Sequence, residues 1–212
     1  AVAAVAQLGT GHVHAVQVAQ TQPAKLAAFE GLWETQTNAP LLLFGWPDPQ
    51  NERTDFMVGL PGALSFGVGF DTNTKVQGLK DFPLADRPPI RTSFATFHLM
   101  VGLGMFFIGF TLLGLFLLWR GKLFENTLYL RLAFFAVPLP FIANELGWIA
   151  AEVGRQPWIV YGLLRTQDAA SPSVPAEQIL ISIIGFGLIY ALLFGVWIYL
   201  LKHKLEAGPE TA

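Results

Sequence analysis

The chain has 212 residues, of which 13% are charged and 53% are hydrophobic, and its mean hydropathy is +0.48. This charge content is about half that of a typical soluble domain, so the composition argues against an ordinary cytosolic enzyme and favours a membrane protein. The net charge of −2 argues against a nucleic-acid partner, and the absence of cysteine excludes disulfides, thiol nucleophiles and cysteine-ligated metals.

The first residues are apolar. Residues 1–9, AVAAVAQLG, read as the end of a transmembrane helix, because they are too few to cross a bilayer alone. No basic segment precedes them, so a secretory signal is a poor interpretation. Because the chain starts at Ala1 rather than Met, we expect a fragment, a processed chain or half of a larger protein.

Residues 10–91 are predicted to form a long loop with short helices. Gln22–Thr35 has three large apolar side chains at helical spacing, which predicts a helix. From Asn38 onward the chain is rich in Pro, Gly and Asp, which predicts loop with a short apolar helix near Gly59–Phe66. The Trp, Phe and Leu content of this loop favours a segment that lies on a membrane surface.

Three later segments are long and apolar enough to cross a bilayer. Residues 92–119 and 178–201 contain no charged side chain. Residues 128–154 form a third candidate despite two internal prolines, which membrane helices tolerate inside a bundle. We therefore expect an all-α integral membrane protein with three full transmembrane helices, the tail of a fourth and a long extracytoplasmic loop.

The orientation is only weakly determined, because equal numbers of basic residues fall on the two sides. Their density is higher in the short connection after the first full span and in the tail, residues 202–212. These segments would then be cytoplasmic, and residues 10–91 and 155–177 would face outside.

Four polar or aromatic residues form a stripe in the third candidate helix. Glu145, Trp148, Glu152 and Arg155 are spaced 3, 4 and 3 residues apart, an arc of about 80° on one helical face. Carboxylates within a membrane are functional candidates by default. The residues alone leave three alternatives open: an ion-pair network in which Arg155 neutralises Glu152, a proton or ion path, and a metal or haem site.

Met100 and His98 lie in the first full span. A methionine in a membrane helix usually serves packing, although methionine can also be an axial haem ligand opposite histidine. His98 is two residues away and points to another helical face, so it cannot be that partner.

Two pairs of polar residues precede the spans. Lys25 and Glu30 fit a solvated amphipathic helix, and their separation of about 140° prevents them from facing one ligand unless the helix bends or ends there. His12 and His14 alternate in a turn rich in Gly and Thr, and without a visible third ligand we interpret them as surface residues.

Several motifs resemble those of subunit I of the cytochrome bd quinol oxidases. EVGRQPW at Glu152–Trp158 is preceded by NELGW at Asn144–Trp148. QTQPAKLAAFEGLWETQ at Gln20–Gln36 is similar to the start of the family's quinol loop. FHLMVGLG at Phe97–Gly104 resembles the helix with the methionine ligand of low-spin haem b. AVPLPFIANELGWIAAEVGRQPW at Ala136–Trp158 resembles the helix with the high-spin haem carboxylate.

The resemblance covers about residues 10–202 and implies an enzyme, a quinol:oxygen oxidoreductase. Such a respiratory oxidase oxidises quinol, reduces dioxygen to water through low-spin haem b, high-spin haem b and haem d, and contributes to the proton motive force. The implied location is the plasma membrane of a bacterium or archaeon, with the quinol loop outside. Implied partners are the N-terminal half of subunit I, subunit II, a small accessory subunit, membrane lipid and quinol.

The resemblance also implies roles for individual residues. Lys25 and Glu30, with Gln22 nearby, would bind and deprotonate quinol. Met100 would ligate the iron of low-spin haem b, and Glu152 would ligate the iron of a high-spin haem.

The remaining candidates would support these sites. Trp148 would lie on the electron route between the low-spin and high-spin haems. Glu145 and Arg155 would serve haem propionates, charge compensation or proton supply. His98, a further cofactor-binding candidate, stands where some relatives have Arg.

The loop is short, which resembles the short quinol-loop class, and the family's first half, with the histidine opposite Met100, is missing. Two alternatives remain: a cyanide-insensitive variant without haem d, and a non-catalytic membrane subunit or carrier with a structural Glu/Arg stripe.

Overall fold

The structure, a computed structural model, describes residues 1–208 and divides into two units, with the second beginning at Ala170. Among the described residues, three helical segments are long and apolar enough to cross a membrane: Leu84–Trp119, Thr127–Gly154 and Ala176–Ala207. The expected helical membrane fold is therefore confirmed. The first two segments belong to the first unit, and the third, with helix α7 (Ala176–Ala207), belongs to the second.

The first helix, α1 (Val2–Thr21), extends well beyond the predicted end at residue 9. It runs through His12 and His14, so the predicted Gly/Thr-rich turn is wrong, because Gly9 and Gly11 adopt helical conformations without breaking the helix. Both histidines are exposed, as we expected.

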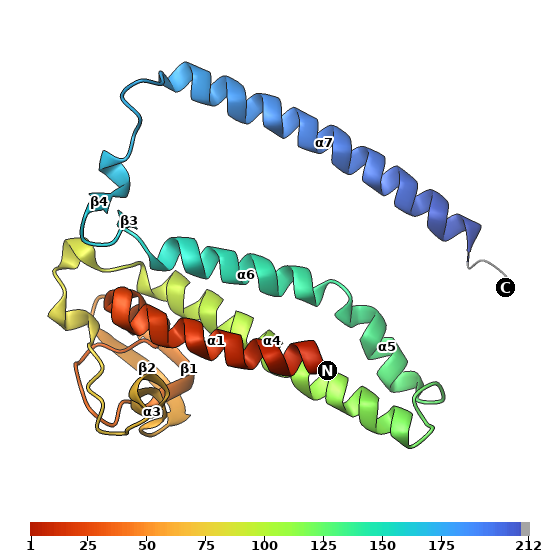
Figure 1. The fold of residues 1–212 in the computed structure, drawn as a ribbon, viewed down its shortest axis with the longest axis horizontal. Helices are drawn as coiled ribbons and strands as arrows, with labels where there is room; N and C mark the ends of the chain where they lie inside the picture. The colour runs from red at the N-terminus through yellow and green to blue at the C-terminus, as the bar shows by residue number, and fades with distance from the viewer. Residues whose placement is uncertain (209–212) are drawn as a thin grey trace. The chain divides into compact units, whose positions relative to one another are not determined.

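The packed helices of the first unit are α4 (Ile90–Trp119) and α6 (Leu139–Gly154), which lie against each other (Figure 1). The third expected span is divided: α5 (Thr127–Ala136) ends before Val137, and α6 starts after Pro138. Pro138 and Pro140 occupy the start of α6, where backbone N–H groups have no partner within the helix.

The loop between α1 and α4 is more ordered than predicted. Helix α2 (Pro23–Phe29) is shorter than the expected Gln22–Thr35, because Gly31 adopts a φ of +61° just after it. Helix α3 (Ala63–Gly69) begins later than the expected Gly59–Phe66.

An antiparallel hairpin, β1 (Leu41–Asp48) and β2 (Arg53–Leu60), was not predicted. Gly45 and Pro47 interrupt the first apolar run, and the pairing has irregularities on both sides of Phe44, so the usual alternation of a strand is obscured. A polar turn connects the end of β1 to the start of β2.

Most buried side chains of the first unit belong to this loop rather than to the membrane helices. One cluster joins α2, α3 and the first strand region, and a second joins α2 to the start of α4. The clusters contain Leu26, Leu32, Ala39, Leu64 and Val76, and Ala27, Ala28, Trp33, Leu79 and Ile90, respectively. The loop is thus a small packed structure that sits on α4.

A second, smaller hairpin follows α6. Its strands are β3 (Trp158–Val160) and β4 (Leu164–Arg165). Arg165 donates to the Ala85 carbonyl at 3.2 Å and forms an ion pair with Asp86. These contacts hold the segment after α6 against the end of the loop.

Candidate functional site

The loop helix α2 contacts the last turn of α6 through Lys25. Its Nζ donates to the carbonyl oxygen of Ala151 at 3.1 Å. Burial lowers the pKa of Lys25, nearby Arg155 lowers it further, and Glu152 acts in the opposite direction. The structure therefore brings Lys25 beside Glu152 and Arg155, which the sequence places more than a hundred residues away.

Lys25 also lines a narrow crevice between the loop and the end of α6. Gln22 and Arg155 also line it. Three predicted site residues, Gln22, Lys25 and Arg155, therefore meet there. The remaining lining residues are Ala24, Asp86, Pro88, Gly154, Gln156, Trp158 and Tyr161. The crevice brings an ammonium, a guanidinium, an amide and a carboxylate close to aromatic rings, but it is closed to a water-sized molecule and has to open before a ligand can enter.

Glu30 lies apart from this crevice, because α2 ends at Phe29 and Glu30 follows as its cap. Its side chain is buried, with only 3% exposed, and burial raises its pKa to about 8 although the backbone N–H of Leu42 donates to it. Its Oε2 has no hydrogen-bond partner within residues 1–208. Lys25 and Glu30 thus point to different neighbours, as their spacing suggested.

His98 reaches the same strand residue as Glu30. Its Nε2 lies 2.9 Å from the carbonyl oxygen of Leu42, and its Nδ1 lies 3.0 Å from that of Phe94. Its ring stacks on Phe94 with a centroid distance of 3.8 Å. Leu42 therefore links Glu30, through its amide, to His98, through its carbonyl.

Met100 lies on the side of α4 that packs against α6. A Cβ atom on Gly147 would come within 2.8 Å of the Met100 sulfur, so the glycine provides the room for this side chain. Gly147 directly precedes Trp148. The structure thus places the predicted methionine ligand against the glycine that precedes Trp148 in α6.

The stripe of Glu145, Trp148, Glu152 and Arg155 forms an ion pair at its C-terminal end and is exposed at its N-terminal end. Arg155 donates to a carboxylate oxygen of Glu152, as the ion-pair alternative proposed, but its buried Nε has no partner in the part of the chain that the structure describes. Glu145 and Trp148 are exposed, and Glu145 has no ion pair within residues 1–208. Because hydrocarbon is a poor environment for a carboxylate, this face is suited to a polar group or to further protein.

Sequence reasoning missed several residues that shape the site. Phe29 packs between α4 and α6, where a Cβ on Gly154 would lie 2.6 Å from its ring. Leu42, which connects Glu30 and His98, acts only through its backbone, so no side-chain pattern could have identified it. For Gly154, the available signal was its position within the EVGRQPW motif.

Known proteins similar to this chain share one family. The family described as cytochrome bd terminal oxidase subunit I matches residues 1–209. The chain belongs to this family. A bd oxidase structure from Geobacillus thermodenitrificans superposes with a TM-score of 0.78 at 31% identity, over 97% of this chain and 47% of that one. The predicted family is thereby confirmed.

Two relatives in the same family are similar along almost the entire chain. Cytochrome bd ubiquinol oxidase subunit 1 of Bacillus subtilis (strain 168) is 36% identical, over 95% of this chain and 45% of its own length. Cytochrome bd-II ubiquinol oxidase subunit 1 of Escherichia coli (strain K12) is 27% identical, over 99% and 53%. The chain thus spans about half the length of these relatives.

Proposed function

We propose that this chain is the C-terminal half of the catalytic subunit of a quinol oxidase. Two quinols would be oxidised for each dioxygen reduced, with four electrons and four protons converting dioxygen to two waters. The observation that carries the proposal is the hydrogen bond from Lys25 to Ala151. It docks the predicted quinol helix on the last turn of the helix that bears Glu152.

At the quinol end, Lys25 and Gln22 would bind the quinol oxygens once the crevice opens. Glu30 lies apart from the crevice, so it would take up a proton passed on from the quinol rather than contact the quinol itself. A base works best when its pKa lies near the working pH. The burial of Glu30 supports this role, since it raises the pKa to about 8. Its Oε2 has no hydrogen-bond partner among the described residues, so it has an unused site for a proton.

At the other end, the family implies haem, and the residues present fit it. Thioether sulfur, as in Met100, is a known type of axial haem ligand, and a carboxylate such as Glu152 can supply an anionic oxygen. The buried Nε of Arg155, which has no partner among the described residues, suits a propionate. We propose that Met100 holds low-spin haem b and Glu152 a high-spin haem. The bound haems would supply one-electron transfer and dioxygen reduction.

The other α6 residues would support this transfer. Trp148 lies one residue beyond the glycine that contacts Met100, which favours a place on the route between the haems. Glu145, exposed and without an ion pair among the described residues, would offer charge compensation or a proton. His98 would hold the segment before Met100 against β1.

Membership of the family supports a location and a set of partners for the chain. The chain would lie in a bacterial or archaeal plasma membrane with the quinol loop outside, and its partners would be the N-terminal half of subunit I, subunit II and an accessory subunit. The high-spin haems would be one haem b and one haem d.

The test uses a purified complex that contains the whole subunit. We expect quinol-dependent oxygen consumption, with a reduced-minus-oxidised spectrum that contains haem bands. Lys25→Met should raise KM for quinol and leave these bands intact. Lys75→Met, at an exposed lysine of the same loop, is the control. A complex without haem bands would refute the oxidase, whereas an unchanged KM in Lys25→Met would refute the quinol role alone.

A further inference from the structure

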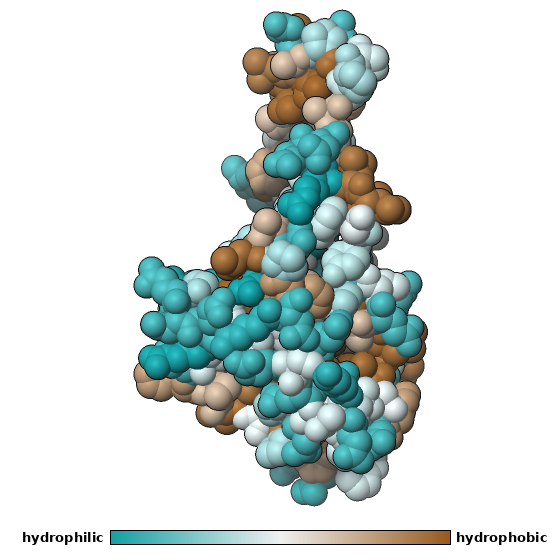
Figure 2. Space-filling view, turned by 90° about the vertical axis from the view of Figure 1, so that its left-hand side faces the viewer, coloured by the Kyte–Doolittle hydropathy of each residue, from teal (hydrophilic) through white to brown (hydrophobic). Residues whose placement is uncertain are grey.

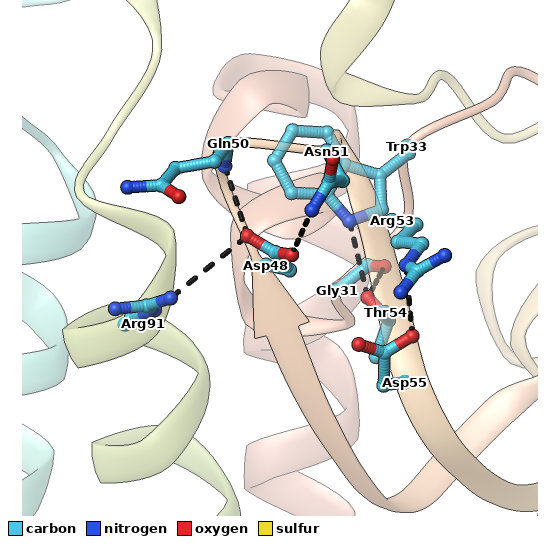
Figure 3. Close-up of polar contacts among 9 residues, drawn as sticks. All are labelled: Gly31, Trp33, Asp48, Gln50, Asn51, Arg53, Thr54, Asp55 and Arg91. Atoms are coloured by element: carbon cyan, nitrogen blue, oxygen red, sulfur yellow. Dashed lines mark hydrogen bonds and ion pairs between the residues drawn. The ribbon is translucent and has the colours of Figure 1, made fainter.

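The β1–β2 hairpin has a polar end and an apolar end. All its charged residues, Asp48, Glu52, Arg53 and Asp55, lie at or next to the turn. In that turn Asp48 accepts from the Gln50 backbone at 3.0 Å and from the Asn51 side chain at 2.6 Å (Figure 3). The opposite end carries exposed apolar side chains: Leu43, Phe44, Met57, Val58 and Leu60.

The hairpin lies along a membrane helix, which defines its direction. Near its polar end, Arg91 donates to the Pro47 carbonyl at 3.2 Å and lies 3.9 Å from a carboxylate oxygen of Asp48 (Figure 3). At the apolar end, Leu42 bonds to His98. Since His98 is seven residues after Arg91, the apolar end lies about 10 Å further along α4.

Arg91 is the last charged residue before the charge-free run of α4. The apolar end of the hairpin therefore lies at the level of the membrane-spanning part of α4, and the polar turn lies at the level of the last charge. The loop end of the first unit is mostly hydrophilic, with hydrophobic side chains at its margins (Figure 2). The change from the polar turn to the apolar end follows the axis of α4.

We propose that the β1–β2 hairpin is inserted edgewise into the lipid interface, with its apolar end at the boundary between headgroups and acyl chains and its turn in water. Aromatic side chains such as Phe44 and Trp46, which are 58% and 60% exposed, favour this boundary. A position deeper in hydrocarbon is excluded by the free edge of β2, whose backbone groups need polar partners.

Lipid fits this surface better than a water-soluble partner does. A water-soluble partner would not require the change from polar to apolar to follow the axis of α4, whereas a bilayer does; a membrane-spanning partner is an outcome that the test below detects. The inserted hairpin also offers its Leu42 amide to Glu30. The inference depends only on α4 crossing the membrane and is independent of quinol oxidation.

Spin labelling of the whole oxidase in liposomes tests this placement. This chain has no cysteine, so Met57→Cys, with Leu43→Cys as a second position on β1, introduces a label site once cysteines in the other chains are replaced. Asn51→Cys in the turn is the matched control. Collisions with dissolved oxygen, which enriches in lipid, are compared with collisions with a water-soluble nickel chelate.

We expect labels at Met57 and Leu43 to collide with oxygen and to lose nearly all collisions with nickel, while the label at Asn51 collides with nickel. Nickel collisions at all three positions would show that the hairpin lies in water and would overturn the proposal. Immobile labels that collide with neither reagent would show that protein covers the hairpin, which would also overturn it.

Discussion

Phe29 of α2 stacks on Phe97 of α4, with ring centroids 4.6 Å apart and planes inclined by 7°. Phe97 precedes Met100 by three residues, so the two side chains share a helical face. Gly154 of α6 leaves space for the edge of the Phe29 ring. One aromatic ring thus joins the predicted quinol helix to both helices that carry predicted haem ligands.

Phe29→Ala should therefore loosen the loop. Phe29 is 7% exposed, and loss of a buried phenylalanine side chain costs about 3–5 kcal/mol. We expect a lower Tm for the complex and a higher KM for quinol, with the haem spectrum retained. Phe135→Ala, at a 70% exposed position of α5, is the control and should change neither quantity. An unchanged KM would show that the stack does not position the quinol helix.

Gly147→Ala should disturb Met100 without removing it. The added methyl group would lie 2.8 Å from the methionine sulfur, which must move because real Cβ contacts are not this short. The side chain is flexible, so we expect a shifted midpoint potential of low-spin haem b in an assembled complex. Redox titration of the purified oxidase measures it. Gly104→Ala, where a Cβ meets nothing within 4 Å, is the control, and equal potentials in the two variants would contradict the placement of Met100.

The burial of Glu30 predicts a pH profile. Its pKa is about 8, so the carboxylate that would accept the quinol proton becomes more abundant as pH rises through that value. We expect kcat/KM for quinol to rise between about pH 7 and pH 9. Glu30→Gln should be slow and lose this rise, whereas Glu34→Gln, at an exposed side chain paired with Lys80, should keep it.

The same ionisation has a consequence for stability. The folded-state pKa of Glu30 lies above the ordinary value of 4.5, so the folded state retains a proton that the unfolded state loses. Stability should therefore fall as pH rises from about 4.5 through about 8. This decline should be smaller in Glu30→Gln. For the catalytic role, a pH profile of kcat/KM for quinol that is the same in wild type and in Glu30→Gln would refute Glu30 as the proton acceptor.

The membrane helices were predictable because their signal is local. An uninterrupted apolar run and the absence of charge identify residues 92–119 as a span, and α4 coincides with it closely. The hairpin was not predictable in this way. Gly45 and Pro47 disrupt its pattern, and its packing involves contacts with α4, far away in the sequence, such as that between Leu42 and His98.

The candidate site likewise has a part that the local sequence predicts and a part that it does not. The family motifs identified the candidate residues. The helical spacing placed Glu152 and Arg155 on one face, where they form an ion pair. The approach of Lys25 to Ala151 spans 126 residues and arises from packing of the loop core, which no local pattern encodes. The separation of Glu30 from Lys25 depends on the end of α2, which Gly31 sets.

The central claim is that Met100 holds the low-spin haem. The most direct measurement is the reduced-minus-oxidised spectrum of the whole oxidase carrying Met100→Leu, beside Met105→Leu on the same helix, where the side chain is 55% exposed. We predict that Met100→Leu loses or shifts the low-spin haem b band while Met105→Leu retains it. An unchanged low-spin band in a correctly assembled Met100→Leu complex would contradict the account.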